Sequence, residues 1–395
     1  MRLLKLIIFL IFINANILAD NYERHLMAYT VDYFGKVTKI DLNEYKIVDS
    51  EKYFDDNSFE GPLIEITPDG KKLFVAGANR KEPTNPLLAI CAQDLMLDEK
   101  IYLPIKVKEG DLPPQVFGLQ MIPDGKKVLI SSYQFDPIEF KYPTYIIDTN
   151  SYKILDKNGV YFRTGESDPV FSKDGKFMYV AAPYSPLRIL NLETYEVKEK
   201  WLYDVKEKLT DGLLFFDNAL FVNVNNMAEI NRGIKKQSYN ALTKISLKNY
   251  EIEKIIFENK GYYKYAISPD RKIMYVISNK GLTMLDSNTF KEIKNIDLKY
   301  ISDNYHCGYY YSQITPDSKY ILFTNGIAKD ETKGIIGVYD IEKDKMIKII
   351  EIPDSFGAEK VVFGYEMVKI SDGKGKEGKI INAGTKEVVP VKKKK

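Results

Sequence analysis

The sequence is poor in the residues that most often build catalytic and metal centres. Among 395 residues there are two histidines, two cysteines and one tryptophan. That is too few for the usual His and Cys clusters that hold zinc, and no C-x-x-C-H stretch encodes a covalently attached haem. The complete Walker pattern G-x-x-x-x-G-K-[ST] and the G-x-S-x-G nucleophile motif are also missing. The sequence therefore carries no familiar metal-ligand or nucleophile motif.

An excess of charge of either sign is missing as well. Lysine and arginine number 57 against 55 aspartates and glutamates. A balanced surface argues against nucleic-acid binding, which needs a basic footprint. The exception is the end of the chain, where Lys392–Lys395 form a run that is typical of a solvated tail.

Long apolar runs are restricted to the N-terminus, which has the pattern of a secretory signal. Arg2 and Lys5 precede the apolar run Leu6–Ile13, and the small residue Ala19 precedes Asp20. The run is too short to span a bilayer comfortably. We therefore expect cleavage after residue 19 and a soluble periplasmic or secreted protein with no membrane contact in its mature form. The alternative is an uncleaved membrane anchor.

What the sequence does contain is a repeated turn followed by an alternating apolar strand. Its fullest form is Thr67-Pro68-Asp69-Gly70-Lys71. Proline presets φ at the first corner, aspartate can accept a bond from the backbone two residues on, and glycine takes the φ > 0 position. The aspartate recurs at Asp69, Asp124, Asp174, Asp217, Asp270 and Asp317. Because they repeat, we interpret these aspartates as turn formers and not as catalytic groups.

A second type of turn occurs once per repeat. Its copies begin at Asp41, Gln93, Asp148, Asn191, Ser246, Asp286 and Asp340. Each lies between two apolar segments, so the unit has four short strands, A to D, in about fifty residues. Units of this length with four strands are typical of β-propeller blades.

We therefore predict an all-β fold: a seven-bladed β-propeller of four-stranded antiparallel blades, closed by a C-terminal strand. The predicted segments are a signal peptide 1–19, a propeller 20–373 and a Lys-rich tail 374–395, with blades at 25–54, 61–104, 113–157, 167–203, 209–257, 261–298 and 306–353. The first blade lacks an inner strand, which the segment Lys360–Val368 can supply. Cys91 and Cys307 then fall in blades 2 and 7, with blade 1 between them, so we expect no disulfide.

The recurring Pro-Asp-Gly-Lys turn and its apolar strand resemble YVTN-type, WD-like propeller repeats. The stretch Phe117–Lys126 and the insert 223–239 before Ala241–Leu247 are also similar to the β subunits of quinohaemoprotein amine dehydrogenases. In that family the β subunit is a periplasmic seven-bladed propeller without a redox cofactor. It holds a dihaem cytochrome subunit and a small quinone-bearing subunit. The resemblance implies that this chain has no cofactor of its own and that haem and quinone belong to its partners.

Strand connectivity predicts where partners bind. In a four-stranded meander the A–B and C–D turns share one face, and the longer B–C and D–A loops share the other. The candidate binding residues on that loop face are Arg80, Glu82, Tyr133, Phe135, Phe140, His306, Tyr309 and Tyr310. His306 and its neighbouring tyrosines either form a site or fill the channel mouth as an aromatic plug. The loop 133–140 either binds a protein or buries its own rings, and His25 is interpreted as structural.

Three functions remain compatible with the sequence. The first is a non-catalytic propeller subunit of a periplasmic redox complex. The second is a stand-alone YVTN-like binding protein of the cell envelope. The third is a propeller hydrolase or lactonase, for which Glu60, Glu166, Asp168 and Asp211 lie near inner-strand entries.

Overall fold

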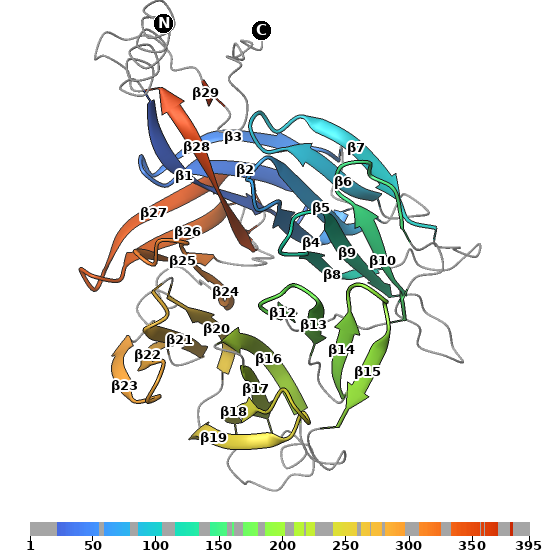
Figure 1. Cartoon of the computed structure of the whole chain (residues 1–395). Coiled ribbons are helices and arrows are strands. Elements are labelled where there is room, and N and C mark those ends of the chain that lie inside the picture. Colours follow the sequence, from blue (N-terminus) through green and yellow to red (C-terminus); the bar gives the residue numbers. More distant parts are fainter. Residues whose placement is uncertain are drawn as a thin grey trace, which may run out of the picture.

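The computed structural model describes most of the predicted propeller. The described residues are 22–54, 59–79, 86–104, 115–133, 143–155, 160–161, 169–180, 186–201, 209–216, 219–225, 240–258, 262–268, 270–278, 281–296, 308–324, 333–355, 357–358, 360–369 and 380–381. They form seven antiparallel sheets arranged in a ring (Figure 1). The prediction of a seven-bladed β-propeller is confirmed.

Each blade is a meander whose strands A to D follow one another outward from the ring centre. Blade 2 consists of β4 (Phe59–Ile66), β5 (Lys72–Asn79), β6 (Pro86–Cys91) and β7 (Leu97–Tyr102); blade 3 of β8 (Gln115–Met121), β9 (Lys127–Tyr133), β10 (Pro143–Asp148) and β11 (Val160–Tyr161); blade 4 of β12 (Val170–Phe171), β13 (Phe177–Val180), β14 (Leu187–Asn191) and β15 (Val197–Lys200). Blade 5 consists of β16 (Leu209–Phe216), β17 (Ala219–Asn225), β18 (Asn240–Ile245) and β19 (Ile252–Glu258); blade 6 of β20 (Tyr262–Ile267), β21 (Ile273–Ser278), β22 (Gly281–Asp286) and β23 (Glu292–Ile296); blade 7 of β24 (Gly308–Ile314), β25 (Tyr320–Thr324), β26 (Lys333–Asp340) and β27 (Lys345–Pro353).

Blade 1 combines both ends of the chain. Its strands B to D are β1 (Tyr22–Val31), β2 (Lys36–Asp41) and β3 (Lys46–Lys52), and its strand A is β28 (Val361–Lys369). β28 pairs antiparallel with β1 from Thr30↔Val361 to Tyr22↔Lys369, and it also contacts β4 and β24 (Figure 1). The predicted closure by the segment 360–368 is therefore confirmed. A short strand that the sequence did not predict, β29 (Ile380–Ile381), pairs with β28.

The A–B turns have the geometry that their sequence implies. In blade 2 the Gly70 amide donates to the Thr67 carbonyl over 2.8 Å, and the Thr67 hydroxyl donates to Asp69 over 2.7 Å. Gly70 has φ 72°. In blades 6 and 7 the same place holds Arg271 and Ser318, which take φ values of 61° and 54°. A side chain can thus occupy this left-handed corner when the surrounding space permits it.

The C–D turns contain a left-handed residue that is usually aromatic. The set is Tyr45, Leu95, Tyr152, Tyr195, Tyr250, Phe290 and Asp344, with φ between 51° and 60°. In blade 3 the Tyr152 amide donates to the Asp148 carbonyl over 2.9 Å. The Tyr152 ring lies 4.6 Å from the Lys72 ammonium of blade 2, and Phe290 of blade 6 packs at 5.7 Å on Phe221 of blade 5. Because each such ring contacts the preceding blade, these turns also join neighbouring blades.

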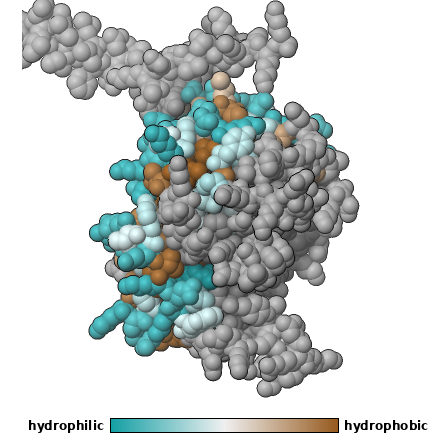
Figure 2. All heavy atoms as spheres, turned by 90° about the vertical axis from the view of Figure 1, so that its right-hand side faces the viewer, coloured by the Kyte–Doolittle hydropathy of each residue, from teal (hydrophilic) through white to brown (hydrophobic). Residues whose placement is uncertain are grey.

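The core lies between neighbouring blades. Blades 1 and 2 bury Tyr29, Leu73 and Leu88 against one another, and each of these is 0% exposed. Full burial of such a side chain stabilises the fold by about 1.5–3 kcal/mol. On the side near β7 and β10, hydrophilic side chains cover most of the described surface, with apolar patches between them (Figure 2). The part of the chain that the structure describes has no helix able to cross a membrane.

Candidate functional site at the loop face

The two faces of the ring differ in the length of their connections. On one face, called the turn face, the A–B and C–D connections are short, such as 67–71, 122–126 and 341–344. On the other face, called the loop face, the B–C and D–A connections include the longer segments 103–114, 134–142, 226–239 and 297–307. This is the asymmetry that the repeat predicted. Long connections on a rigid scaffold are where binding residues usually reside.

The B–C connection of blade 1 on the loop face, 32–35, is short and is held by hydrogen bonds. The Asp32 carboxylate accepts hydrogen bonds from the amides of Phe34 and Lys36, over 2.9 and 2.7 Å. The Lys36 ammonium in turn donates to the Pro353 carbonyl of blade 7 over 2.7 Å. This part of the loop face is therefore fixed to blade 7.

Backbone irregularities mark the inner strands where they start at the loop face. The A–B register shifts between Glu60 and Leu63 in β4, and between Val116 and Gly118 in β8. The same occurs at Asp211/Leu213 in β16, Tyr262/Lys264 in β20 and Gly308/Gln313 in β24. Bulges of this kind re-aim side chains and are common beside functional sites. They make the channel mouth on the loop face the least regular part of the inner strands.

Two exposed aromatic side chains stand where outer strands reach the loop face. Tyr102 ends β7 and is 52% exposed, and Trp201, the single tryptophan, follows β15 and is 46% exposed. Tyrosine and tryptophan at a surface are the residues that most often dominate protein interfaces. The sequence analysis missed both. The available signal was an aromatic residue at the end of a D strand that contains three consecutive charged residues.

Most of the binding residues predicted from the sequence lie outside the described residues. This holds for Arg80, Glu82, Phe135, Phe140 and His306, and also for Cys307 and for the carboxylates Glu166 and Asp168. The backbone places Tyr133 at the end of β9, on the loop face, and Tyr309 and Tyr310 in the irregular part of β24. Cys91 ends β6 as a free thiol, and burial raises its pKa.

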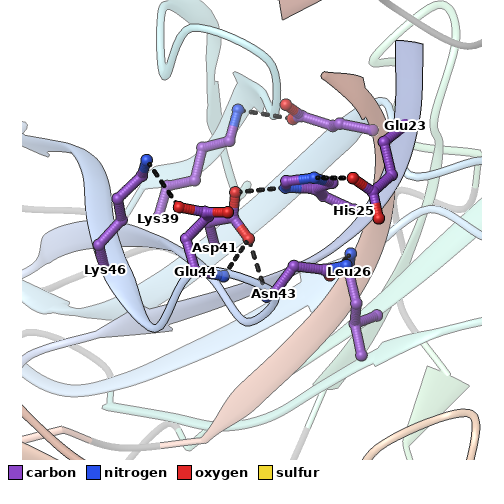
Figure 3. Close-up of polar contacts among 9 residues, drawn as sticks. Glu23, His25, Leu26, Lys39, Asp41, Asn43, Glu44 and Lys46 are labelled. Carbon is purple, nitrogen blue, oxygen red and sulfur yellow. Dashed lines mark hydrogen bonds and ion pairs between the residues drawn. The ribbon is translucent and has the colours of Figure 1, made fainter. Parts of the chain in front are cut away.

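His25 is part of the structure of blade 1, as the sequence suggested. Its Nδ1 lies 2.6 Å from Asp41 Oδ2 and its Nε2 lies 3.5 Å from Glu23 Oε2 (Figure 3). Asp41 also accepts the amide of Asn43 over 2.8 Å, and Asn43 Oδ1 accepts the amide of Leu26 over 2.9 Å (Figure 3). His25 is only 5% exposed. This network joins the start of β1 to the C–D turn of blade 1.

A second buried polar cluster, called the closure cluster, lies beside it and consists of Tyr29, Lys39 and Glu366. Lys39 Nζ lies 2.6 Å from Glu366 Oε1 and donates to the Gln93 carbonyl of blade 2 over 2.8 Å. The Tyr29 hydroxyl donates to Glu366 over 2.8 Å. Burial, followed by the negative charge of Glu366, raises the pKa of Tyr29 above its usual range. The sequence analysis missed this cluster, although a lysine and a glutamate at inward positions of apolar strands were visible.

Five of the six repeated aspartates serve the turns, as predicted from their repetition, and the sixth, Asp217, lies outside the described residues. A hydrogen bond from the Ser172 hydroxyl, and then one from the Lys176 amide, lower the pKa of Asp174. The amide of Ser151, followed by its hydroxyl, lowers the pKa of Asp148 in the same way. Among the residues that the structure describes, no group of three or more His, Cys, Asp or Glu side chains could hold a metal ion.

Comparison with known proteins identifies the fold alone. No protein-family model matches the chain, and no curated protein matches its sequence. A hypothetical selenium-binding protein from Sulfolobus tokodaii aligns with a TM-score of 0.60 at 12% identity, over 87% of this chain and 94% of that one. Hydrazine synthase from Kuenenia stuttgartiensis aligns with a TM-score of 0.52 at 16% identity, over 83% of this chain and 95% of that one. The dihydro-heme d1 dehydrogenase NirN aligns with a TM-score of 0.52 at 13% identity, over 85% and 74%.

Proposed function

We propose that this propeller binds protein partners through its loop face and serves as a cofactor-free subunit of an exported redox complex. The observation that carries the proposal is the pair of exposed aromatics, Tyr102 and Trp201, at the loop-face ends of two outer strands. They stand at the start of the long connections 103–114 and 201–208. Large amphipathic rings around variable loops on a rigid base are features of a protein-binding surface.

The rigidity of the opposite face supports this choice of surface. The turn face is held by hydrogen bonds within each turn and by ring contacts between neighbouring blades, such as Lys72 with Tyr152. A scaffold of this kind can position two partners relative to one another at little cost in conformational entropy.

The redox part of the proposal rests on similarity. The repeat and the stretch Phe117–Lys126 resemble the quinohaemoprotein amine dehydrogenase β subunit. One of the similar propellers, NirN, is by its name a dehydrogenase of dihydro-haem d1. The expected partners are a dihaem cytochrome subunit and a small quinone-bearing subunit, with haem and quinone held by them. The predicted signal peptide would deliver the chain to the periplasm.

The proposal is tested by mild affinity capture of the tagged chain from its native cell envelope. We expect captured protein to show haem absorbance and to reduce a dye when an amine is added. Tyr102→Ala and Trp201→Ala should each lower the captured haem by about tenfold, the effect of one interface hot spot. Ile293→Ala is the matched control, because Ile293 is 56% exposed in β23 and away from these loops.

Other outcomes separate the alternatives. A colourless chain that captures other proteins through Tyr102 and Trp201 would sink the redox role and favour a stand-alone binding protein of the envelope. Capture that is equally sensitive to Ile293→Ala would sink the choice of the loop face.

A further inference from the structure

The inner strand of blade 1 closes the ring without a turn to fix its register. In blade 2 the connection 67–71 holds β4 against β5 in one alignment. β28 and β1 come from opposite ends of the chain, so no turn between them sets their alignment. A slip by one residue moves every side chain to the other face, whereas a slip by two keeps the faces and is the closer competitor.

Lys39 occupies a place that is apolar in most other blades. The residues two positions before the C–D turn on strand C are Ala89, Ile146, Ile189, Met284 and Val338 in blades 2, 3, 4, 6 and 7. Lys39 is 0% exposed and reaches Glu366 on β28, which is 5% exposed. A buried charge without its partner is strongly unfavourable. Only the observed register gives both charges a partner and also satisfies the Tyr29 hydroxyl.

Gly364 also favours the observed alignment. A Cβ at Gly364 would lie 3.1 Å from Ile66 Cδ1 and 3.4 Å from a Tyr29 ring carbon, while Gly70 of blade 2 packs onto its Cα. A slip by two residues would bring Val362 or Glu366 to this place. At the other end of β28, Lys360 forms an ion pair with Glu65 of β4, which the same slip would break.

We propose that the closure cluster of Lys39, Glu366 and Tyr29 selects the register in which β28 closes the propeller. The cluster acts together with Gly364: the ion pair favours one alignment, and in that alignment the missing side chain of Gly364 fits the contact with blade 2. Buried polar groups are best attested in such a register role, in which apolar replacement retains the fold but loses uniqueness.

Cysteine pairs across β1 and β28 can report the register. The Leu26 amide and carbonyl bond to Asn43 and Leu42, away from β28. By alternation Arg24 also lacks ladder bonds to β28, so Arg24 and its partner Met367 form the closer type of antiparallel pair, about 4.5 Å between Cα atoms, which suits a disulfide. A slip by two would instead place Tyr365 or Lys369 opposite Arg24.

The test uses the full chain with Cys91 and Cys307 replaced by alanine. Arg24→Cys is combined with Met367→Cys to detect the observed register, or with Lys369→Cys or Tyr365→Cys to detect slipped ones. Each pair is compared in the intact background, in Lys39→Met/Glu366→Leu, and in the control Lys333→Met/Glu351→Leu. The control removes an exposed ion pair, 2.8 Å long, on β26 and β27, whose register the turn 341–344 fixes.

We expect slipped disulfides to rise about tenfold in the Lys39→Met/Glu366→Leu background and to stay at the intact level in the control. Glu366→Gln, which removes the charge but retains an acceptor for Tyr29, should give an intermediate rise. Slipped disulfides that remain at the intact level while the native pair forms completely would overturn the proposal. So would loss of the folded ring in both Lys39→Met/Glu366→Leu and Glu366→Gln, because the cluster would then supply stability and not register.

Discussion

The A–B turns of blades 2 to 4 allow a substitution experiment that isolates one contact. Gly125 of blade 3 has φ 71°, and a Cβ built on it would lie 2.7 Å from Cδ and 3.3 Å from Cγ of Pro68, in the preceding turn. Gly175 of blade 4 has nearly the same φ, 69°, but a Cβ there would meet no atom within 4 Å. Gly125→Ala and Gly175→Ala therefore share the backbone cost and differ in the clash.

The magnitudes follow from these two terms. An alanine in the left-handed region costs about 1–2 kcal/mol, and this applies to both variants. Overpacking against the Pro68 ring adds about 1–3 kcal/mol at Gly125 only. We expect Gly125→Ala to lower the free energy of unfolding by about 2–5 kcal/mol and Gly175→Ala by about 1–2 kcal/mol.

Urea unfolding followed by far-UV circular dichroism measures the difference, with the m-value checked for constancy. Adding Pro68→Ala to Gly125→Ala should recover most of the excess loss, because it removes the ring that the new methyl group meets. Equal losses for the two glycine variants, or no recovery in the double variant, would refute the reasoning that the turns of neighbouring blades pack directly on one another.

Three further predictions follow from the described contacts. Hydrogen bonds lower the pKa of Asp174 below the ordinary 3.8, so the stability that this carboxylate contributes is complete above pH 3.8 and is lost as the pH falls through the lowered pKa. Asp174→Asn should therefore flatten the decline of the urea midpoint on acidification. Lys39→Met leaves Glu366 buried without its cation and should lower the free energy of unfolding by about 3–5 kcal/mol, whereas Lys333→Met at an exposed pair should cost at most about 1 kcal/mol by the same measurement. Trp201→Ala should change the thermal midpoint little, since the ring is 46% exposed, although it lowers partner capture.

The repeated elements of the fold were predictable because their signals are local. The turn around Asp69 and its copies encode hairpins, and the missing inner strand of blade 1 pointed to the segment that became β28. The left-handed tyrosines, such as Tyr152, were not predictable from propensity, because φ > 0 disfavours bulky residues. The conformation of Tyr152 is explained only by contacts in the fold: its amide bonds to the Asp148 carbonyl and its ring contacts Lys72. The aspartates were correctly interpreted as turn formers because repetition separates a structural role from a catalytic one.

The candidate site was predictable only as a surface. Connectivity assigns long connections to one face, and the structure has them there. The exposed aromatic residues Tyr102 and Trp201 were missed, because the exposure of a side chain depends on the neighbouring strands and not on the residue type. Lys39 and Glu366 were missed for a different reason: they lie near opposite ends of the sequence, and only ring closure brings them together.

The most direct test of the central claim, that partners dock on the loop face, is hydrogen exchange of the affinity-captured complex compared with the purified chain alone. We predict slower exchange in peptides that cover 103–114, 201–208 and 226–239, with no change in the turn-face segments 67–71 and 122–126. Protection confined to the turn face, or none at all in a complex that remains assembled, would contradict the claim.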